Sequence, residues 1–233
     1  MAVVVAGADV VPTRLAGVRR RIEAAGGDPE GIRIIAVTKG FGPDAVEAAR
    51  HAGLADLGEN YAQELLAKAP VTGPGARWHF LGPVQRNKVG RLAPQVSAWH
   101  GIDRSAAADA VAAAAPGAEV MVQVNVTGDP GRPGCRPDDL AGLVDHIRSG
   151  PLHLSGLMAV GPVPVGDASR EVFRWLADRA RQLDLTELSM GMSDDFEMAV
   201  AEGATTLRLG RVLFGARPGR DNTATIGFET GGI

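Results

Sequence analysis

Lys39 is the first residue of the chain whose type and place could support chemistry. It ends the apolar, β-branched run Arg33-Ile34-Ile35-Ala36-Val37-Thr38-Lys39, a pattern typical of a strand buried on both faces. At the carboxyl end of such a strand a lysine lies at the mouth of an α/β fold, where a partly buried amine can act as a nucleophile. Most lysines at strand ends are simply solvated, so this interpretation needs support from the rest of the chain.

Two later loops have the composition of an anion-binding site. Gly191 and Ser193 precede a helix that we expect to begin at Asp194, and Gly210 and Arg211 offer the same feature on the next loop. The free N–H groups of helix N-termini attract anions, and glycine lets the backbone come close to them. The two loops therefore predict a place for a phosphate.

Ordinary helix capping accounts for the first of these loops equally well. Asp194 and Glu197 have the spacing of a capping box, and Ser193 can serve as a local cap. Asp194 and Asp195 would also repel a phosphate unless their side chains point away. The spacing alone leaves the phosphate site and the simple cap as equal alternatives.

The elements that must position these residues alternate between strands and helices. Strands are expected at residues 32–38, 55–58, 78–81, 96–102, 120–126, 152–158, 187–189 and 206–209. Helices are expected at 43–52, 61–69, 86–92, 105–115, 137–148, 168–183, 194–202 and 212–215, after a leading helix at 10–25. Eight such units predict an α/β fold, a single (β/α)₈ barrel of the TIM type with an extra N-terminal helix, and an open doubly wound sheet is the alternative. We expect one domain over residues 1–233, with its core at about 10–217 and a flexible tail at 218–233.

Composition excludes several classes of protein. The net charge of -3 gives no general attraction to nucleic acid or membrane, and the chain has no apolar run long enough to span a bilayer. The single cysteine, Cys135, cannot form an internal disulfide, which predicts a cytoplasmic protein, and a lone barrel predicts a monomer. His79 and His100 are too isolated in the sequence to indicate a metal site.

In such a barrel the carboxyl ends of the strands meet at one mouth, and the loops after strands seven and eight commonly hold a phosphate. Lys39 and the loops at Ser193 and Gly210 would then share that mouth. Pyridoxal 5'-phosphate (PLP) requires this combination, an amine for its aldehyde and an anchor for its phosphate. Partial burial and a nearby cation such as Arg208 would lower the pKa of the lysine and favour the neutral amine.

A series of specific strings extends over nearly the whole chain, from about residue 10 to 217. They are Ala36-Val37-Thr38-Lys39, Gly58-Glu59-Asn60-Tyr61, Trp78-His79-Phe80-Leu81-Gly82-Pro83-Val84-Gln85-Arg86-Asn87-Lys88, Gln123-Val124-Asn125, Gly156-Leu157-Met158, Leu188-Ser189-Met190-Gly191-Met192-Ser193-Asp194-Asp195 and Arg208-Leu209-Gly210-Arg211-Val212-Leu213-Phe214-Gly215. Through these strings the chain resembles the YggS/PROSC family, also called pyridoxal phosphate homeostasis proteins. The resemblance implies a barrel like the N-terminal domain of alanine racemase.

The resemblance also implies a set of cofactor-binding residues. Lys39 would carry PLP as an imine, and Asn60 would lie beside the ring. Ser193 and the Gly210 loop would hold the phosphate, and Arg208 would face the pyridine nitrogen. Because arginine keeps its proton at neutral pH, that nitrogen would stay unprotonated, which weakens the ring as an electron sink and favours a carrier. The full set is Lys39, Asn60, Met158, Ser193, Arg208, Gly210 and Arg211.

Two positions depart from the family pattern. Arg211 stands where many members carry a small hydroxyl residue, and its guanidinium could strengthen phosphate binding or clash with it. Arg132 stands where relatives often carry a lysine. If that lysine is a secondary attachment point for the cofactor, this chain has lost it, because arginine forms no stable imine.

Three functions are weighed. The first is a non-catalytic PLP-binding protein that stores the cofactor or delivers it to PLP-dependent apo-enzymes. The second is a PLP-dependent amino-acid racemase, which in the alanine racemase pattern uses a lysine and a tyrosine from a second domain. The chain ends soon after strand eight, and its one tyrosine, Tyr61, is expected to pack at a helix start, so we favour the carrier. The third, a sugar-phosphate enzyme, leaves Lys39 unexplained.

Overall fold

Eight parallel strands close into a barrel in the order of the sequence, as predicted. The computed structural model describes residues 10–217. The strands are β1 (Arg33–Val37), β2 (Asp56–Glu59), β3 (Arg77–Phe80), β4 (Val96–Ile102), β5 (Glu119–Gln123), β6 (His153–Met158), β7 (Glu187–Ser189) and β8 (Thr206–Leu209). β1 pairs in parallel with β8, Ala36 opposite Leu209, so the sheet has no open edge and the open-sheet alternative is excluded.

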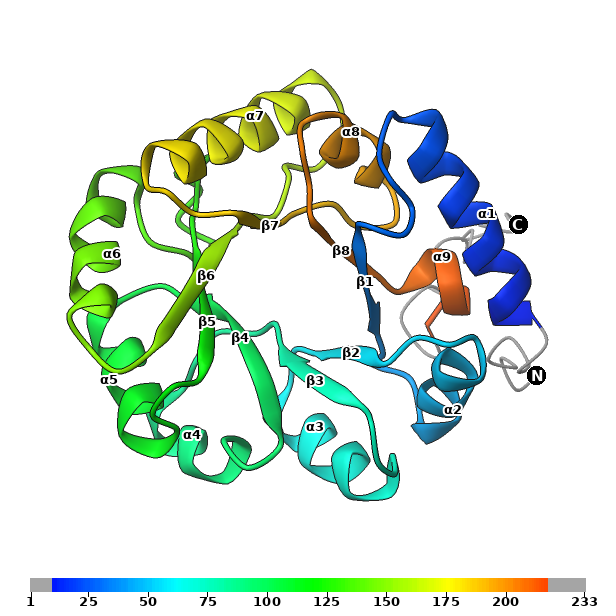
Figure 1. Cartoon of the computed structure of the whole chain (residues 1–233), viewed down its shortest axis with the longest axis horizontal. Coiled ribbons are helices and arrows are strands. Elements are labelled where there is room, and N and C mark those ends of the chain that lie inside the picture. The colour runs from blue at the N-terminus through cyan, green and yellow to red at the C-terminus, as the bar shows by residue number, and fades with distance from the viewer. Residues whose placement is uncertain (1–9, 218–233) are drawn as a thin grey trace, which may run out of the picture.

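Helices form a ring outside the barrel (Figure 1). They are α2 (Pro43–His51), α3 (Ala62–Lys68), α4 (Arg86–Leu92), α5 (Ser105–Ala114), α6 (Leu140–Arg148), α7 (Asp167–Gln182), α8 (Phe196–Ala201) and α9 (Arg211–Phe214), with short 3₁₀ turns at η1 (Ala69–Val71) and η2 (Pro137–Asp139). Within residues 10–217 no helix has the length and apolar character needed to cross a membrane. The expectation of a loose tail concerns residues 218–233, which lie outside the described part.

The leading helix α1 (Val10–Ala24) closes the gap beside the last helix. Its buried residues, Val11, Leu15, Val18 and Ile22, recur at helical spacing and form one apolar stripe. The helix packs against α9, α2 and α8, and Arg14 Nη1 donates to the Leu213 carbonyl at 3.0 Å. α1 therefore ties the beginning of the barrel to its end.

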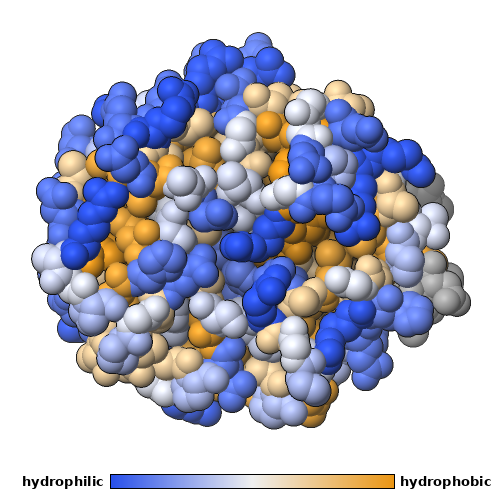
Figure 2. Space-filling model, in the orientation of Figure 1, coloured by the Kyte–Doolittle hydropathy of each residue, from blue (hydrophilic) through white to orange (hydrophobic). Residues whose placement is uncertain are grey.

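The interior of the barrel and the space under the helices are packed differently. The main apolar core lies between the strands and the helices, whereas Ile35, Val37 and Leu81 form a small cluster of their own inside the barrel. Gly58 is required beside that cluster, because a Cβ there would lie 2.7 Å from Leu81 Cδ1. Much of the remaining interior is polar, and strongly hydrophilic side chains gather over the middle of the face seen in Figure 2.

Three boundaries differ from the expected ones by two or three residues, for local reasons. β5 ends at Gln123 instead of residue 126, because Val124 bridges to Cys135 of the following loop. The helix expected from residue 137 begins as a 3₁₀ turn and becomes α-helical at Leu140. α8 begins at Phe196 and not at Asp194, because residues 192–195 form a turn in which Asp195 Oδ1 accepts from the Met192 N–H at 2.6 Å.

Candidate functional site

A cavity of about 440 Å³ opens at the carboxyl ends of the strands. Its walls include Lys39 after β1, Asn60 after β2, Met158 at the end of β6 and Arg208 on β8. The seven predicted cofactor-binding residues all line it: Lys39, Asn60, Met158, Ser193, Arg208, Gly210 and Arg211. The fold therefore brings together residues separated by up to 172 positions, from Lys39 to Arg211.

The backbone on both sides of Lys39 is held by α3. Lys68 Nζ donates to the Thr38 carbonyl at 2.8 Å, and the Gly40 N–H donates to Glu64 Oε2 at 2.8 Å. Lys39 itself is half-buried. These two hydrogen bonds, one at Thr38 and one at Gly40, restrict the backbone of Lys39 and so the position from which its side chain reaches the cavity.

Lys68 belongs to a buried ion pair beneath this backbone. Its Nζ lies 2.5 Å from Glu59 Oε1, and the two side chains are 5% and 0% exposed. Thr38 Oγ1 donates to the same carboxylate oxygen at 2.8 Å. Burial raises the pKa of Glu59, although the hydrogen bond and charge of Lys68 act in the opposite direction. The sequence contained no sign of this pair, because it is made by a strand end and a helix end that meet only in the fold.

The chain contains three lysines, Lys39, Lys68 and Lys88, all within the described residues. Lys68 is committed to its ion pair with Glu59. Lys88, on α4, lines a separate hollow of about 340 Å³ beside Tyr61. Lys39 is the lysine that lines the cavity at the strand ends.

The two predicted anion loops are joined by a hydrogen bond. Ser193 Oγ accepts from the Val212 N–H at 3.1 Å and is thereby held against the loop after β8. A serine hydroxyl has one donor and two acceptor positions, so Ser193 can still donate to a ligand in the cavity. The expected capping box of Asp194 and Glu197 does not form, because the helix begins two residues later at Phe196.

The two acidic residues of the first loop are placed so that neither charge faces the cavity unpaired. Asp195 is buried below the loop, and burial raises its pKa, an effect partly offset by the Met192 N–H and by Arg208. Asp194 is exposed and pairs with Arg211, the residue that departs from the family pattern. Arg211 thus lies at the cavity wall with its charge already balanced by Asp194.

Gly191 has a packing role that the sequence did not indicate. It does not line the cavity, whereas its neighbours Met192 and Ser193 do. Its φ of +90° and the 2.7 Å that would separate a Cβ from the Ala199 Cβ show that the backbone turns tightly against α8. Glycine is therefore needed here to pack the loop against α8.

Arg208 is buried in the wall of the cavity. Its Nη1 donates to the Ser189 carbonyl at 2.5 Å and to Ser189 Oγ at 2.9 Å, and its Nη2 donates to the Ala159 carbonyl at 2.8 Å. Burial lowers the pKa of Arg208 to about 10, which still leaves the guanidinium charged at neutral pH. These bonds use three of its five N–H groups, so its Nε–H and the second Nη2–H remain for a ligand in the cavity.

Two buried amide oxygens of the lining residues have no hydrogen-bond partner within residues 10–217. They are Asn60 Oδ1 and Gln123 Oε1. Buried polar atoms are nearly always paired in proteins, so an unpaired pair at one cavity indicates that a polar ligand completes it. Gln123 is a lining residue that stood in the sequence only within a family string and had no predicted role, since β5 was expected to run past it to residue 126. Asn125 instead ties the next loop, donating from Nδ2 to the Asp129 carbonyl at 2.8 Å.

Arg132 and Cys135 belong to that loop. Arg132 Nη1 donates to the Gly161 carbonyl at 2.7 Å, which attaches the loop after β5 to the one after β6. Cys135 is buried, and burial raises the pKa of its thiol to about 12, so it stays protonated at neutral pH. Arginine at 132 therefore has a structural contact here.

His79 and His100 are too far apart in the sequence to indicate a metal site, but the fold brings them into contact. Their rings lie together inside the barrel, with His79 Nδ1 2.9 Å from His100 Nε2. Strands β3 and β4 are neighbours, which brings positions 21 residues apart to one level of the barrel. Within residues 10–217, no group of three or more His, Cys, Asp or Glu side chains is arranged to hold a metal ion.

Comparison with known proteins places this geometry in a family. The family model of the alanine racemase N-terminal domain matches residues 15–218. The pyridoxal phosphate homeostasis protein of Pseudomonas aeruginosa is 41% identical over 212 residues, covering 87% of this chain and 92% of the relative. The protein of the same name from Escherichia coli K12 is 37% identical over 223 residues, covering 87% and 95%.

Solved structures agree with the sequence relatives. PipY of Synechococcus elongatus without PLP superposes with a TM-score of 0.80 at 32% identity, covering 88% of this chain and all of that one. The structure of PipY with PLP bound superposes with a TM-score of 0.76 at 30% identity. Alanine racemase of Corynebacterium glutamicum superposes with a TM-score of 0.65 at 16% identity, covering 91% of this chain and 62% of that one. At this identity the likeness is one of fold alone. The chain belongs to the family of pyridoxal phosphate homeostasis proteins, as its sequence motifs predicted.

Proposed function

We propose that this protein binds PLP in the cavity at the carboxyl ends of its strands and acts as an intracellular carrier of the cofactor. The observation that supports this most directly is the convergence of seven residues on one cavity, with a lysine on one side and the paired loops of Ser193 and Gly210 on the other. The binding of PLP by the related PipY structure supports the same ligand.

The residues present fit PLP in kind. Lys39 supplies a primary amine, and the Ser193 hydroxyl, the Gly210 loop and Arg211 supply donors for a phosphate. Asn60 Oδ1 and Gln123 Oε1 supply buried amide oxygens that lack hydrogen-bond partners within residues 10–217. When bound, PLP supplies an aldehyde that condenses with a neutral lysine amine and releases one water, a linkage that water can reverse.

Charge at Arg208 favours holding the cofactor over using it. A guanidinium whose pKa is about 10 donates hydrogen bonds at neutral pH and does not protonate a ring nitrogen. An unprotonated pyridine is a weak electron sink, so proton abstraction from a bound amino acid gains little from the ring. The site is better suited to reversible attachment.

The racemase alternative needs a second base opposite Lys39. The one tyrosine of the chain, Tyr61, is 50% exposed and lines the hollow beside Lys88, and it is absent from the residues that line the cavity. Its position therefore gives no support to a two-base mechanism. The names of the relatives, homeostasis proteins and not racemases, point the same way.

The decisive test compares delivery with catalysis. Loaded protein is mixed with a PLP-dependent apo-enzyme beside free PLP at matched concentration, and recovery of the apo-enzyme's activity is followed. We expect the loaded protein to restore that activity, and we expect single-enantiomer alanine incubated with it to keep its optical purity. Rapid racemisation of alanine would contradict the proposed carrier function and support the racemase alternative.

A second expectation concerns the phosphate end of the cavity. Ser193→Ala removes a donor for the phosphate together with the acceptor of the Val212 N–H, so cofactor affinity should fall by about 1–3 kcal/mol. Equilibrium dialysis measures this, and Ser193→Thr, which keeps the hydroxyl, should retain most of the affinity. An unchanged dissociation constant in Ser193→Ala would place the anchor elsewhere.

Other expectations about partners stay predictions from the sequence. These are delivery to PLP-dependent apo-enzymes, a cytoplasmic location, a monomeric state, and the absence of nucleic-acid or membrane partners. The same holds for the extent of the domain over residues 1–233.

A further inference from the structure

A continuous chain of buried polar side chains crosses the interior of the barrel from the cavity toward the opposite mouth. It begins at Arg208, whose Nη1 lies 2.9 Å from Ser189 Oγ. Ser189 Oγ lies 2.9 Å from His100 Nδ1, and His100 Nε2 lies 2.9 Å from His79 Nδ1. His79 Nε2 then lies 2.8 Å from Asp56 Oδ1. All five residues are at most 7% exposed.

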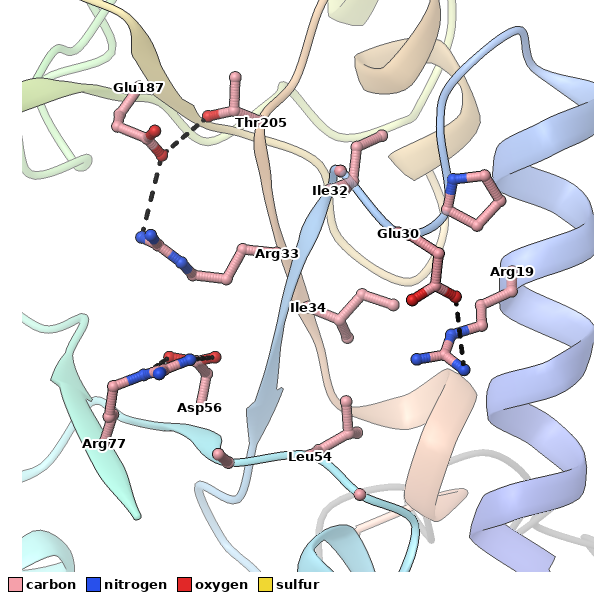
Figure 3. Close-up of a pocket in the computed structure, with 14 residues that line it drawn as sticks. Arg19, Glu30, Ile32, Arg33, Ile34, Leu54, Asp56, Arg77, Glu187 and Thr205 are labelled. Atoms are coloured by element: carbon pink, nitrogen blue, oxygen red, sulfur yellow. Dashed lines mark hydrogen bonds and ion pairs between the residues drawn. The ribbon is translucent and has the colours of Figure 1, made fainter. Parts of the chain in front are cut away.

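The far end of this chain lies at the amino ends of the strands. Asp56 is the first residue of β2 and lines a second hollow, of about 360 Å³. Figure 3 shows Arg77 of β3 lying against Asp56, with its Nε 2.8 Å from Asp56 Oδ1. In the same view Arg33 is directed at Glu187, another first residue of a strand. The hydrogen-bonded chain thus begins in a guanidinium at one mouth of the barrel and ends in a paired carboxylate at the other.

The hydrogen bonds of the chain fit one direction of donation. A carboxylate can only accept, so His79 donates through Nε2. Neutral His79 then accepts at Nδ1 from His100 Nε2, and neutral His100 accepts at Nδ1 from the Ser189 hydroxyl. The Ser189 oxygen accepts from Arg208. Every donor has an acceptor in this arrangement, which is how ring tautomers are assigned.

The reverse direction leaves a donor unmatched. If His79 carried a proton on each nitrogen, His100 would accept at Nε2 and donate from Nδ1 to Ser189. Ser189 Oγ would then accept from both His100 and Arg208, and its own proton would need another acceptor in a fully buried position. Burial lowers the pKa of His100 well below its ordinary value, with the charge of Arg208 acting in the same direction, so this ring stays neutral.

We propose that His100 is a positioning residue for the cofactor site: by accepting from the Ser189 hydroxyl, it turns the serine oxygen toward Arg208 and fixes the guanidinium in the cavity wall. This rests on the proposed binding of PLP. Arg208 is held by Ser189 and Ala159, and its remaining N–H groups face the ligand only while those contacts hold. His100, which does not line the cavity, therefore acts on the environment of the cofactor ring through Ser189 and Arg208.

Two variants of nearly equal shape separate this role from simple packing. His100→Asn keeps an acceptor oxygen near the place of Nδ1, whereas His100→Leu has the same branching and no acceptor. We expect His100→Leu to weaken PLP binding on the order of tenfold and to shift the absorbance maximum of the bound cofactor, as for one lost hydrogen bond to a charged group. His100→Asn should restore both values to near those of the parent protein.

Ser189→Ala tests the same link without changing a ring. It should reproduce the spectral shift of His100→Leu, and the double variant should show no further loss, because both changes break one chain. Equal behaviour of His100→Leu and His100→Asn, or additive effects in the double variant, would overturn the proposal. Thermal unfolding of each variant, measured in parallel, reports whether a loss reflects folding.

The tautomers can be read in the protein without cofactor. The chain has five histidines, and ¹⁵N NMR distinguishes a protonated ring nitrogen from an accepting one. We expect His79 and His100 to carry their proton on Nε2, with His100→Asn used to assign the signals. A proton on Nδ1 of His100 would overturn the positioning chain. Failure of the parent protein to bind PLP, with these tautomers as expected, would instead overturn the proposed function.

Discussion

Lys39→Ala should abolish the imine absorbance band that the protein acquires when it is incubated with PLP. The band reports a covalent link between the cofactor and a lysine amine, and Lys39 is the lysine that lines the cavity. The expected change is complete loss, since alanine offers no amine and a noncovalently held cofactor retains the spectrum of its free aldehyde. The measurement is an absorbance titration of both proteins with PLP.

The low lysine content of the chain makes this assignment unusually sharp. Only Lys68 and Lys88 can substitute for Lys39 among side chains, and Lys68 is enclosed by its ion pair. Lys88→Ala is the matched control, because Lys88 lies on α4 beside the separate hollow, and it should leave the band unchanged. Borohydride reduction followed by peptide mapping should place the added mass on the peptide with Lys39. A band that persists in Lys39→Ala would show that PLP is attached to an amine other than that of Lys39.

Fold prediction from this sequence succeeded because strand and helix signals were local. The run Ile34–Val37 is apolar and β-branched and is buried in β1, and Pro43 begins α2 as proline at a first turn commonly does. Once eight such units were recognised, a closed barrel was favoured over an open sheet, and the meeting of the strand ends at one mouth followed from that closure. That is why Lys39 and Ser193, though 154 positions apart, could be predicted to share one cavity.

Contacts inside the barrel could not be predicted in the same way. They depend on which residues of neighbouring strands lie at the same level, and a shift of one residue turns a side chain to the other face. His79 and His100 meet because β3 has an irregular register with β4 between Trp78 and His79. The tight packing at Gly191 could not be predicted either. A Cβ at this position would lie 2.7 Å from the Ala199 Cβ, a contact that only the folded structure shows.

Removing Lys68 should have the largest effect on stability of the changes considered. Lys68→Met keeps the length and apolar stem of the side chain but deletes the ammonium that lies 2.5 Å from Glu59 Oε1. Glu59 would then be a fully buried carboxylate with its main counter-charge gone, and breaking a buried pair in this way costs about 3–5 kcal/mol. Urea unfolding of the cofactor-free protein measures the loss of free energy.

The pH dependence of that loss follows from the direction of the Glu59 shift. Burial raises the pKa of Glu59 above its ordinary 4.5, and loss of Lys68 removes an opposing influence, so the variant's pKa should rise further. A carboxyl group with a raised folded pKa contributes stability that is present below its unfolded pKa and is lost as pH rises through the folded pKa. Lys68→Met should therefore be less destabilised at pH 5 than at pH 8.

A second substitution distinguishes the buried charge from the loss of packing. Lys68→Met combined with Glu59→Gln removes both charges of the Lys68–Glu59 pair, so it should recover much of the stability and reduce the difference between pH 5 and pH 8. Its cofactor affinity should nevertheless stay low, because the Thr38 carbonyl no longer accepts a hydrogen bond from Lys68. Of the two hydrogen bonds that α3 makes to the backbone around Lys39, only the one between the Gly40 N–H and Glu64 then remains. Full recovery of both stability and affinity would mean that the ion pair contributes only to the stability of the barrel. Recovery of stability without recovery of affinity would show that the ion pair also positions Lys39.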